Sequence, residues 1–208
     1  MKNKKKQNVI YILDRSGSMS SVITDMIGGI NTSIKQLKED EEVESLVTIV
    51  LFDEGYQLVC LKESANSVSE LSPDKVFARG TTSLYDAIGK TLNLFSNLNL
   101  GKNEIPPVVL IYTDGMENSS KSFSLNEVNK TISNLTEKDW VFNYSGSDHD
   151  AWTQSNKLGI GAQNTISLKK EHINASFDVF ISKLSSYRQV GSRGLMSYNE
   201  EDTARLNR

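Results

Sequence analysis

Cysteine and histidine are scarce in this chain of 208 residues, which contains one cysteine and two histidines. The single cysteine, Cys60, has no partner for an internal disulfide, and no Cys/His spacing typical of a zinc site is present. These absences argue against a small secreted domain held together by disulfides. We therefore expect a protein of a reducing compartment, the cytoplasm.

Excess positive charge and long apolar runs are also missing. The formal net charge is -3, so no sequence-wide positive field attracts nucleic acid or anionic lipid. The run Val9–Leu13 follows several lysines, but it is too short for the core of a signal peptide or for a membrane span, and no other run approaches that length. We expect a soluble protein that has neither nucleic acid nor a membrane as its partner.

The length and the hydrophobic content of 38% suit one domain with a single substantial core. Residues 1–8 are predicted to form a basic N-terminal leader, residues 9–190 the domain, and residues 191–208 a polar C-terminal extension. Because the extension is polar and terminal, we expect it to be loosely attached.

Apolar runs that predict strands alternate with segments that predict amphipathic helices. The predicted strands are Val9–Leu13, Leu46–Phe52, Tyr56–Leu61, Val108–Tyr112, Trp140–Tyr144 and Asn164–Leu168. The predicted helices are Val22–Leu37, Leu84–Leu98, Leu125–Leu135, Asp150–Lys157 and Ile173–Leu184. Within the first helix, Gly28 and Gly29 lower helix propensity, which close packing would explain.

The connections between these elements decide the fold class. Only residues 53–55 separate the second strand from the third, and so short a link permits only an antiparallel hairpin. The remaining strands alternate with helices, as they do in a parallel sheet. We predict an α/β fold, a doubly wound Rossmann-like three-layer sandwich, with a mostly parallel six-stranded sheet and one antiparallel edge strand.

Oxygen-bearing side chains follow two of the buried strands. The loop after the first strand carries Asp14, Ser16 and Ser18, with Gly17 to relax the backbone, and Asp114 follows the strand Val108–Tyr112. Ligands of open α/β sheets bind beyond the carboxyl ends of the strands. Carboxylate and hydroxyl oxygens suit a hard divalent cation such as Mg²⁺.

The pattern Asp14-x-Ser16-x-Ser18, with Thr82 in residues 80–87 and Asp114 in residues 113–115, resembles the metal-ion-dependent adhesion site of von Willebrand factor A domains. The resemblance extends over roughly residues 9–187. It implies direct metal contacts from Ser16 and Ser18, water-mediated contacts from Asp14 and Asp114, and a direct or water-mediated contact from Thr82. The implied cation is Mg²⁺, with Mn²⁺ or Ca²⁺ as alternatives.

This resemblance also implies a function. In that family an acidic side chain of a partner protein typically completes the coordination of the metal, so we expect a protein-binding module and not an enzyme. Single domains of this kind resemble the stand-alone A-type proteins of bacteria and their phages. The alternative is a Mg²⁺-dependent enzyme acting on phosphate esters. Against it, no second aspartate follows Asp14 at the spacing of aspartyl-phosphate enzymes, and no Walker loop is present.

Several nearby residues allow two interpretations. Thr81 stands where the family commonly has glycine, which would crowd Thr82, while Arg15 and Arg79 are close enough in sequence to line the rim of the site. Glu117 and Asn118 either orient that rim or are ordinary polar residues of an exposed loop. Residues 148–150, Asp-His-Asp, are either a second metal or acid-base site or a helix cap beside an exposed histidine, and the cap is the preferred interpretation.

Overall fold

The computed structural model describes residues 4–147, 150–169 and 172–206, and it contains a six-stranded sheet in the order β3-β2-β1-β4-β5-β6. Five strands run parallel, and only the edge strand β3 is antiparallel, paired to β2. The strands are β1 (Lys5–Asp14), β2 (Val43–Phe52), β3 (Tyr56–Ser64), β4 (Glu104–Tyr112), β5 (Val141–Ser147) and β6 (Thr165–Leu168). The predicted fold class and the hairpin are confirmed.

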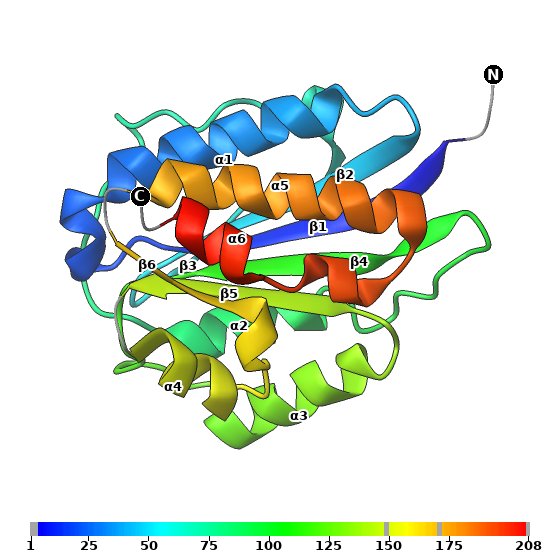
Figure 1. Cartoon of the computed structure of the whole chain (residues 1–208). Helices are drawn as coiled ribbons and strands as arrows, with labels where there is room; N and C mark the ends of the chain where they lie inside the picture. Colours follow the sequence, from blue (N-terminus) through cyan, green and yellow to red (C-terminus); the bar gives the residue numbers. More distant parts are fainter. Residues whose placement is uncertain (1–3, 148–149, 170–171, 207–208) are drawn as a thin grey trace.

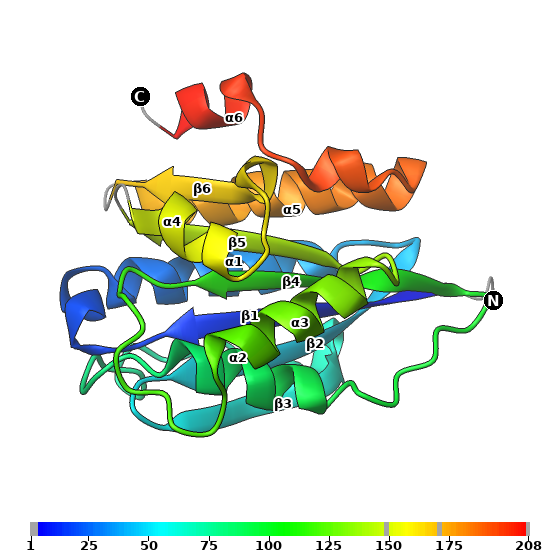
Figure 2. The same cartoon turned by 90° about the horizontal axis from the view of Figure 1, so that it is seen from below.

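Helices cover both faces of the sheet and make three layers (Figures 1 and 2). One face carries α1 (Ile23–Lys38), α5 (Ile173–Val190) and α6 (Glu200–Arg205). The other carries α2 (Leu84–Asn93), α3 (Leu125–Thr136) and α4 (Asp150–Lys157). Short 3-10 turns occur at η1 (Gly17–Ser21), η2 (Ala65–Ser67), η3 (Ala162–Asn164) and η5 (Arg193–Met196). No helix in the described part of the chain is both long and apolar enough to cross a membrane.

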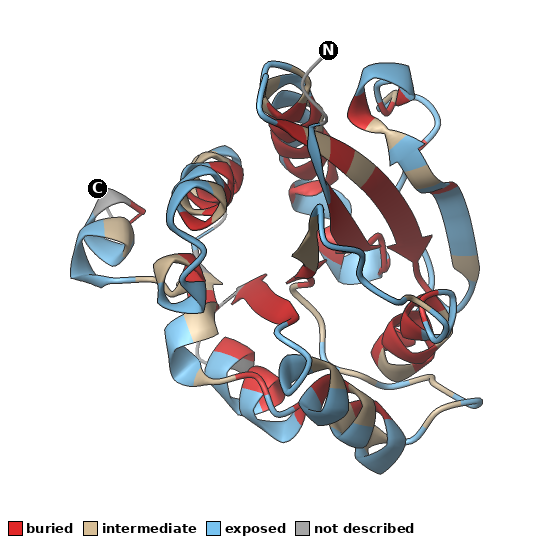
Figure 3. Ribbon diagram, turned by 90° about the vertical axis from the view of Figure 1, so that its right-hand side faces the viewer, coloured by how far each residue is buried: buried red, intermediate tan, exposed pale blue. Residues whose placement is uncertain are grey.

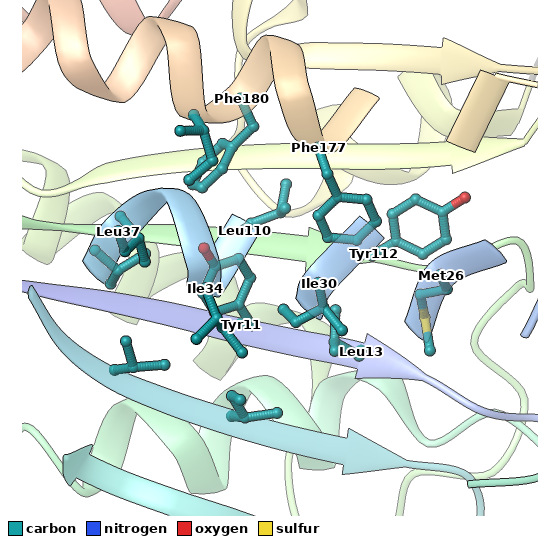
Figure 4. Close-up of a cluster of buried hydrophobic side chains, with 14 of the residues drawn as sticks. Tyr11, Leu13, Met26, Ile30, Ile34, Leu37, Leu110, Tyr112, Phe177 and Phe180 are labelled. Carbon is teal, nitrogen blue, oxygen red and sulfur yellow. The ribbon is translucent and has the colours of Figure 1, made fainter. Parts of the chain in front are cut away.

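Strand β1 lies inside the sheet, between β2 and β4, and is buried from Gln7 to Asp14. Figure 3 shows that buried residues gather on the sheet and on the sides of the helices that face it. Tyr11 and Leu13 point into the core under α1 and α5, while Ile10 and Ile12 point into the core under α2 and α3. Figure 4 shows the first of these cores, in which aromatic rings from α5 lie over the side chains of β1 and β4. Burial on both faces explains why the strand is a continuous apolar run rather than an alternating one.

Close packing of α1 against α5 depends on Gly29. A Cβ atom at Gly29 would lie 2.3 Å from Cδ2 of Phe177, whereas one at Gly28 would lie 3.4 Å from its nearest neighbour. A side chain of any size at position 29 would therefore push the two helices apart. Only one glycine of the pair is explained by helix packing.

Several strands begin earlier than the apolar pattern predicts. Strand β1 starts at Lys5 and β2 at Val43, because parallel ladders continue through polar residues at the ends of strands. Strand β4 includes Pro106 and Pro107, and its register with β1 shifts between Gln7 and Val9. Proline cannot donate to a ladder, so an irregularity at this point is expected. Ladder pairing, not hydrophobicity, sets these boundaries.

The C-terminal extension differs from our expectation of loose attachment. Met196 and Leu206 are 0% and 1% exposed and belong to the core under α1 and α5. The backbone N–H of Tyr198 donates to Gln163 at 2.7 Å, and Lys183 of α5 pairs with Asp202 at 2.5 Å. Two isolated apolar residues in a polar stretch have no periodicity, so the sequence did not indicate that they are anchors.

Candidate metal centre

The candidate site lies where the order of the strands reverses. Strand β1 pairs with β2 on one side and β4 on the other, and the carboxyl ends of β1 and β4 lie side by side. Asp14 is the last residue of β1, and Asp114 follows β4 by two positions. A third loop joins them, since the N–H of Gly17 donates to the carbonyl of Gly80 at 3.1 Å. Ligands of doubly wound sheets bind at this position.

Hydrogen bonds link the side chains of the first loop to those of the loop after β4. The hydroxyls of Ser16 and Ser18 are 3.0 Å apart, and the Ser18 hydroxyl donates to Oδ1 of Asp114 at 2.6 Å. The Thr113 hydroxyl donates to Oδ2 of Asp14 at 2.5 Å. Oδ1 of Asp14 accepts the backbone N–H of Ser16 at 2.6 Å. Both carboxylates are thereby held in fixed orientations.

Thr82 completes the cluster, as the surroundings of Gly115 show. A Cβ atom at Gly115 would lie 2.8 Å from Oγ1 of Thr82, 3.3 Å from Oγ of Ser18 and 3.5 Å from Oδ2 of Asp14. Oxygens from the loop after β1 and from the loop that carries Thr82 therefore face one small space beside Gly115 of a third loop, and glycine leaves that space open. The structure brings the predicted residues together, including Ser16 and Asp114 through their contacts with Ser18.

Burial varies across the cluster. Asp14, Ser16 and Thr82 are at most 3% exposed, Asp114 is half-buried and Ser18 is exposed. Among the described residues, no group of three or more His, Cys, Asp or Glu side chains is placed to hold a metal ion. A cation at this position would therefore need the hydroxyls as well as the two carboxylates. That mixed oxygen donor set suits a hard divalent ion.

Burial raises the pKa of Asp14 to about 6. Hydrogen bonds from Thr113 and Ser16 act in the opposite direction, and the neighbouring charge of Asp114 adds to the increase. Burial makes it costly to ionise Asp14. A cation beside the carboxylate would offset that cost and lower its pKa. A proton and a cation would therefore compete for Asp14.

Arg15 does not line the rim of the site, contrary to what its sequence position allowed. Its side chain is buried, and Nε donates to Oδ2 of Asp53 at 2.9 Å. Arg79 donates to the same oxygen at 2.8 Å, and half of its side chain is exposed. Burial alone would raise the pKa of Asp53, but the hydrogen bond from Arg79, the N–H of Gly55 and both guanidinium charges lower it. The hairpin residue Asp53 therefore ties the loop after β1, which contains Arg15, to the loop that carries Arg79 and Thr82.

The hairpin also holds the residues on either side of Thr82. The N–H of Thr81 donates to Oε2 of Glu54 at 3.1 Å, and the N–H of Ser83 donates to the carbonyl of Asp53 at 3.0 Å. Thr81 itself is exposed. The threonine that replaces the family's usual glycine therefore lies at the surface and does not displace Thr82 from the cluster.

The contact made by Thr113 was not foreseen from the sequence, and of the two interpretations open for Asn118 the structure supports orientation of the rim. Thr113 orients Asp14, and Asn118 accepts the backbone N–H of Thr82 at 2.9 Å while donating its own N–H to the Thr82 carbonyl at 3.0 Å. Position beside Asp114 was the only available signal for Thr113. The alternative site at residues 148–150 cannot be compared, because Asp148 and His149 lie outside the described residues.

The model of the von Willebrand factor type A domain matches residues 8–178. The chain belongs to this family. The match begins inside β1, covers the other five strands in full and ends inside α5. It therefore includes all three loops that meet at the candidate site. No curated protein matches the sequence.

Solved structures of A domains share the fold at low sequence identity. A von Willebrand factor type A protein from Catenulispora acidiphila has a TM-score of 0.60 at 17% identity, covering 86% of this chain and 42% of its own. The vWF domain of the type V pili tip protein Mfa5 from Porphyromonas gingivalis has a TM-score of 0.64 at 9% identity, covering 91% and 98%. Manganese-loaded TRAP protein from Plasmodium vivax has a TM-score of 0.56 at 19% identity, covering 74% and 62%. The chain thus spans less than two thirds of the Catenulispora and Plasmodium proteins.

Proposed function

We propose that this A domain contains a metal-ion-dependent adhesion site. One divalent cation is held there by Asp14, Ser16, Ser18, Thr82 and Asp114. The proposal rests on one observation, the convergence of oxygens from two loops, those of Asp14, Ser18 and Thr82, on the space beside Gly115 of a third loop. The physiological ion we propose is Mg²⁺, because two carboxylates and several hydroxyls provide oxygens only. Mn²⁺ and Ca²⁺ are the alternatives, and the TRAP structure of this fold is manganese-loaded.

We further propose that the cation is presented to an acidic residue of a partner protein. Ser18 is exposed and Asp114 half-buried, so the cluster opens to solvent on the side away from the sheet. Two carboxylates that act through water would leave the charge of the cation only partly neutralised. An aspartate or glutamate of a partner would complete the coordination and neutralise the site. The chain would act as a binding module without catalysis, and the compartment we propose is the cytoplasm.

A Mg²⁺-dependent enzyme acting on phosphate esters is less well supported. Asp14 is oriented by Thr113 and Ser16 at the floor of the cluster, and it is 0% exposed. A carboxylate in that position is suited to holding a cation but is not accessible as a nucleophile. Arg15 and Arg79 are the basic side chains nearest in sequence to Asp14 and Thr82, and both pair with Asp53. They are therefore engaged in ion pairs and not directed at a phosphate group in the cluster.

Calorimetric titration of chelator-treated protein with Mg²⁺, Mn²⁺ and Ca²⁺ tests the metal site. We expect saturable binding with one ion per chain, and its loss in Asp14→Ala. The matched control is Asp40→Ala, because Asp40 is also a carboxylate that accepts backbone N–H groups but lies before the start of β2, at the opposite end of the sheet. No saturable binding by the wild type, or unchanged binding by Asp14→Ala, would contradict the proposal.

Peptide arrays test recognition of an acidic residue. We expect aspartate- and glutamate-containing peptides to bind in Mn²⁺, to be released by EDTA, and to lose binding when the acid is changed to the corresponding amide. Binding that persists in EDTA would show a surface that does not use the metal. Turnover of phosphate esters that requires both Mg²⁺ and Asp14 would favour the enzyme instead.

A further inference from the structure

The loop after Asp114 turns back and lies against the start of α2. Asn118 is the residue of this loop that contacts Thr82, and it does so at two points, with its side-chain Oδ1 accepting at 2.9 Å and its backbone N–H donating at 3.0 Å. The two contacts hold the backbone of Thr82 on both sides, at its N–H and at its carbonyl. Thr82, one candidate ligand, is thus fixed to the loop that carries a second candidate ligand, Asp114.

The backbone of this loop is held by contacts that do not involve Asn118. Glu117 accepts the N–H groups of Tyr85, Ser119 and Ser120 at 2.7–2.9 Å. Asp86 accepts three successive N–H groups, those of residues 121–123, at 2.8–3.2 Å. Burial tends to raise the pKa of Asp86, but these N–H groups and Lys90 lower it, so the carboxylate stays ionised. Removing the Asn118 side chain should therefore leave the loop in place.

Thr82 has particular need of such a contact. It lies two residues before α2 begins at Leu84, where backbone N–H groups have no partner within the helix. The Asn118 carboxamide supplies the acceptor for the Thr82 N–H. Without it, the peptide unit between Thr81 and Thr82 loses the acceptor for its N–H and can turn toward water, while the Thr82 carbonyl keeps its bond to the Asn118 N–H. The Thr82 hydroxyl, whose oxygen would lie 2.8 Å from a Cβ atom at Gly115, would move with that peptide unit.

We propose that Asn118 is a positioning residue of the metal site, which acts through Thr82 to set the separation between the Thr82 hydroxyl and Asp114. This inference rests on the proposed function. A cation binds oxygens at about 2.0–2.1 Å, so a ligand displaced by a few tenths of an ångström contributes little. Residues that orient metal ligands typically contribute about 10- to 100-fold to metal affinity. Because Asn118 is exposed on the loop, we expect the lower end of that range.

A double-mutant cycle in the full chain, measured by calorimetry with Mn²⁺, distinguishes positioning from general stabilisation. Asn118→Ala should weaken Mn²⁺ binding about ten-fold, and Thr82→Ala at least as much. The double variant should be no weaker than Thr82→Ala alone, because Asn118 acts only through Thr82. Asn118→Asp keeps the acceptor oxygen and should restore much of the affinity.

Ser120→Ala is the matched control, since Ser120 lies in the same loop and bonds the N–H of Asp86 rather than Thr82. It should leave Mn²⁺ affinity within about two-fold of wild type. A second measurement, amide hydrogen exchange, is made on the metal-free chain. Exchange of the Thr82 amide hydrogen should accelerate at least about ten-fold in Asn118→Ala and remain unchanged in Ser120→Ala.

Each outcome of the cycle has a distinct meaning. Additive losses in the double variant, or equal losses in Asn118→Ala and Ser120→Ala, would overturn the positioning role while leaving the metal site intact. Wild-type protein that binds no Mn²⁺ would overturn the proposed function, and the role of Asn118 with it.

Discussion

Replacing Gly115 by alanine adds one methyl group to the space where the candidate ligands converge. The new carbon would lie 2.8 Å from Oγ1 of Thr82, 3.3 Å from Oγ of Ser18 and 3.5 Å from Oδ2 of Asp14. A cation about 2.0–2.1 Å from such oxygens, with its bound waters, needs the same volume. The methyl group should therefore compete directly with the cation.

The size of the effect follows from that overlap. Loss of direct contact with one or two ligands should raise the Kd for Mn²⁺ at least about 100-fold, which corresponds to about 2.8 kcal/mol. The cost to the metal-free fold should be smaller, about 1 kcal/mol, because the closest atom is the hydroxyl oxygen of Thr82 and its side chain can rotate. In a chain of this size that cost lowers the Tm by about 2–4 °C.

Two assays separate these effects. Calorimetric titration with Mn²⁺ measures the loss of affinity, and thermal unfolding in EDTA measures the cost to the fold. Gly101→Ala is the control, because its added carbon would lie no closer than 3.7 Å to any atom, in a loop at the amino end of β4. Wild-type Mn²⁺ affinity in Gly115→Ala would refute the placement of the cation among these side chains.

Three further changes test the packing and electrostatics of the fold. Gly29→Ala should destabilise the chain by about 1–3 kcal/mol, because the added carbon overlaps Phe177. Gly28→Ala should be neutral or stabilising by up to about 1 kcal/mol. Chemical denaturation of both variants measures the difference. Because the folded-state pKa of Asp14 is raised to about 6, the folded chain retains a proton that the unfolded chain releases, so metal-free stability should fall as pH rises from about 4 to 6. Asp14→Asn should therefore raise the metal-free Tm at pH 8 but not at pH 4, and an equal change at both values would contradict the assignment. Met196→Ala should cost about 2–5 kcal/mol in urea unfolding if the C-terminal extension is part of the core, and no change would mean that the extension detaches.

The ligand set of the candidate site could be proposed from the sequence because its residues lie in short, ordered motifs. Asp14, Ser16 and Ser18 alternate along one loop, and Asp114 directly follows a strand that is recognisable by its apolar run. Strand ends of a parallel sheet meet at one edge, so local pattern and topology together place these side chains near one another. Their role in binding a cation stays a prediction.

The fold class was determined in the same way. A continuous apolar run predicts a doubly covered strand, and a three-residue link predicts an antiparallel hairpin, because both depend only on neighbouring residues. The ends of strands were less predictable. Lys5 joins β1 and Glu104 joins β4 because the neighbouring strand offers ladder partners, and that information is not local.

Only the tertiary structure decided which polar residues support the site. Asp53 pairs with Arg15 across 38 positions and with Arg79 across 26, and Asn118 reaches Thr82 across 36. In the sequence Asp53 is an ordinary turn residue, and two interpretations of Asn118 stay open, since aspartate and asparagine favour turns whatever their partners are. A contact between distant residues depends on how the whole chain folds, so no local pattern marks it. The sequence alone therefore identified the candidate ligands, and the fold determined what holds them in place.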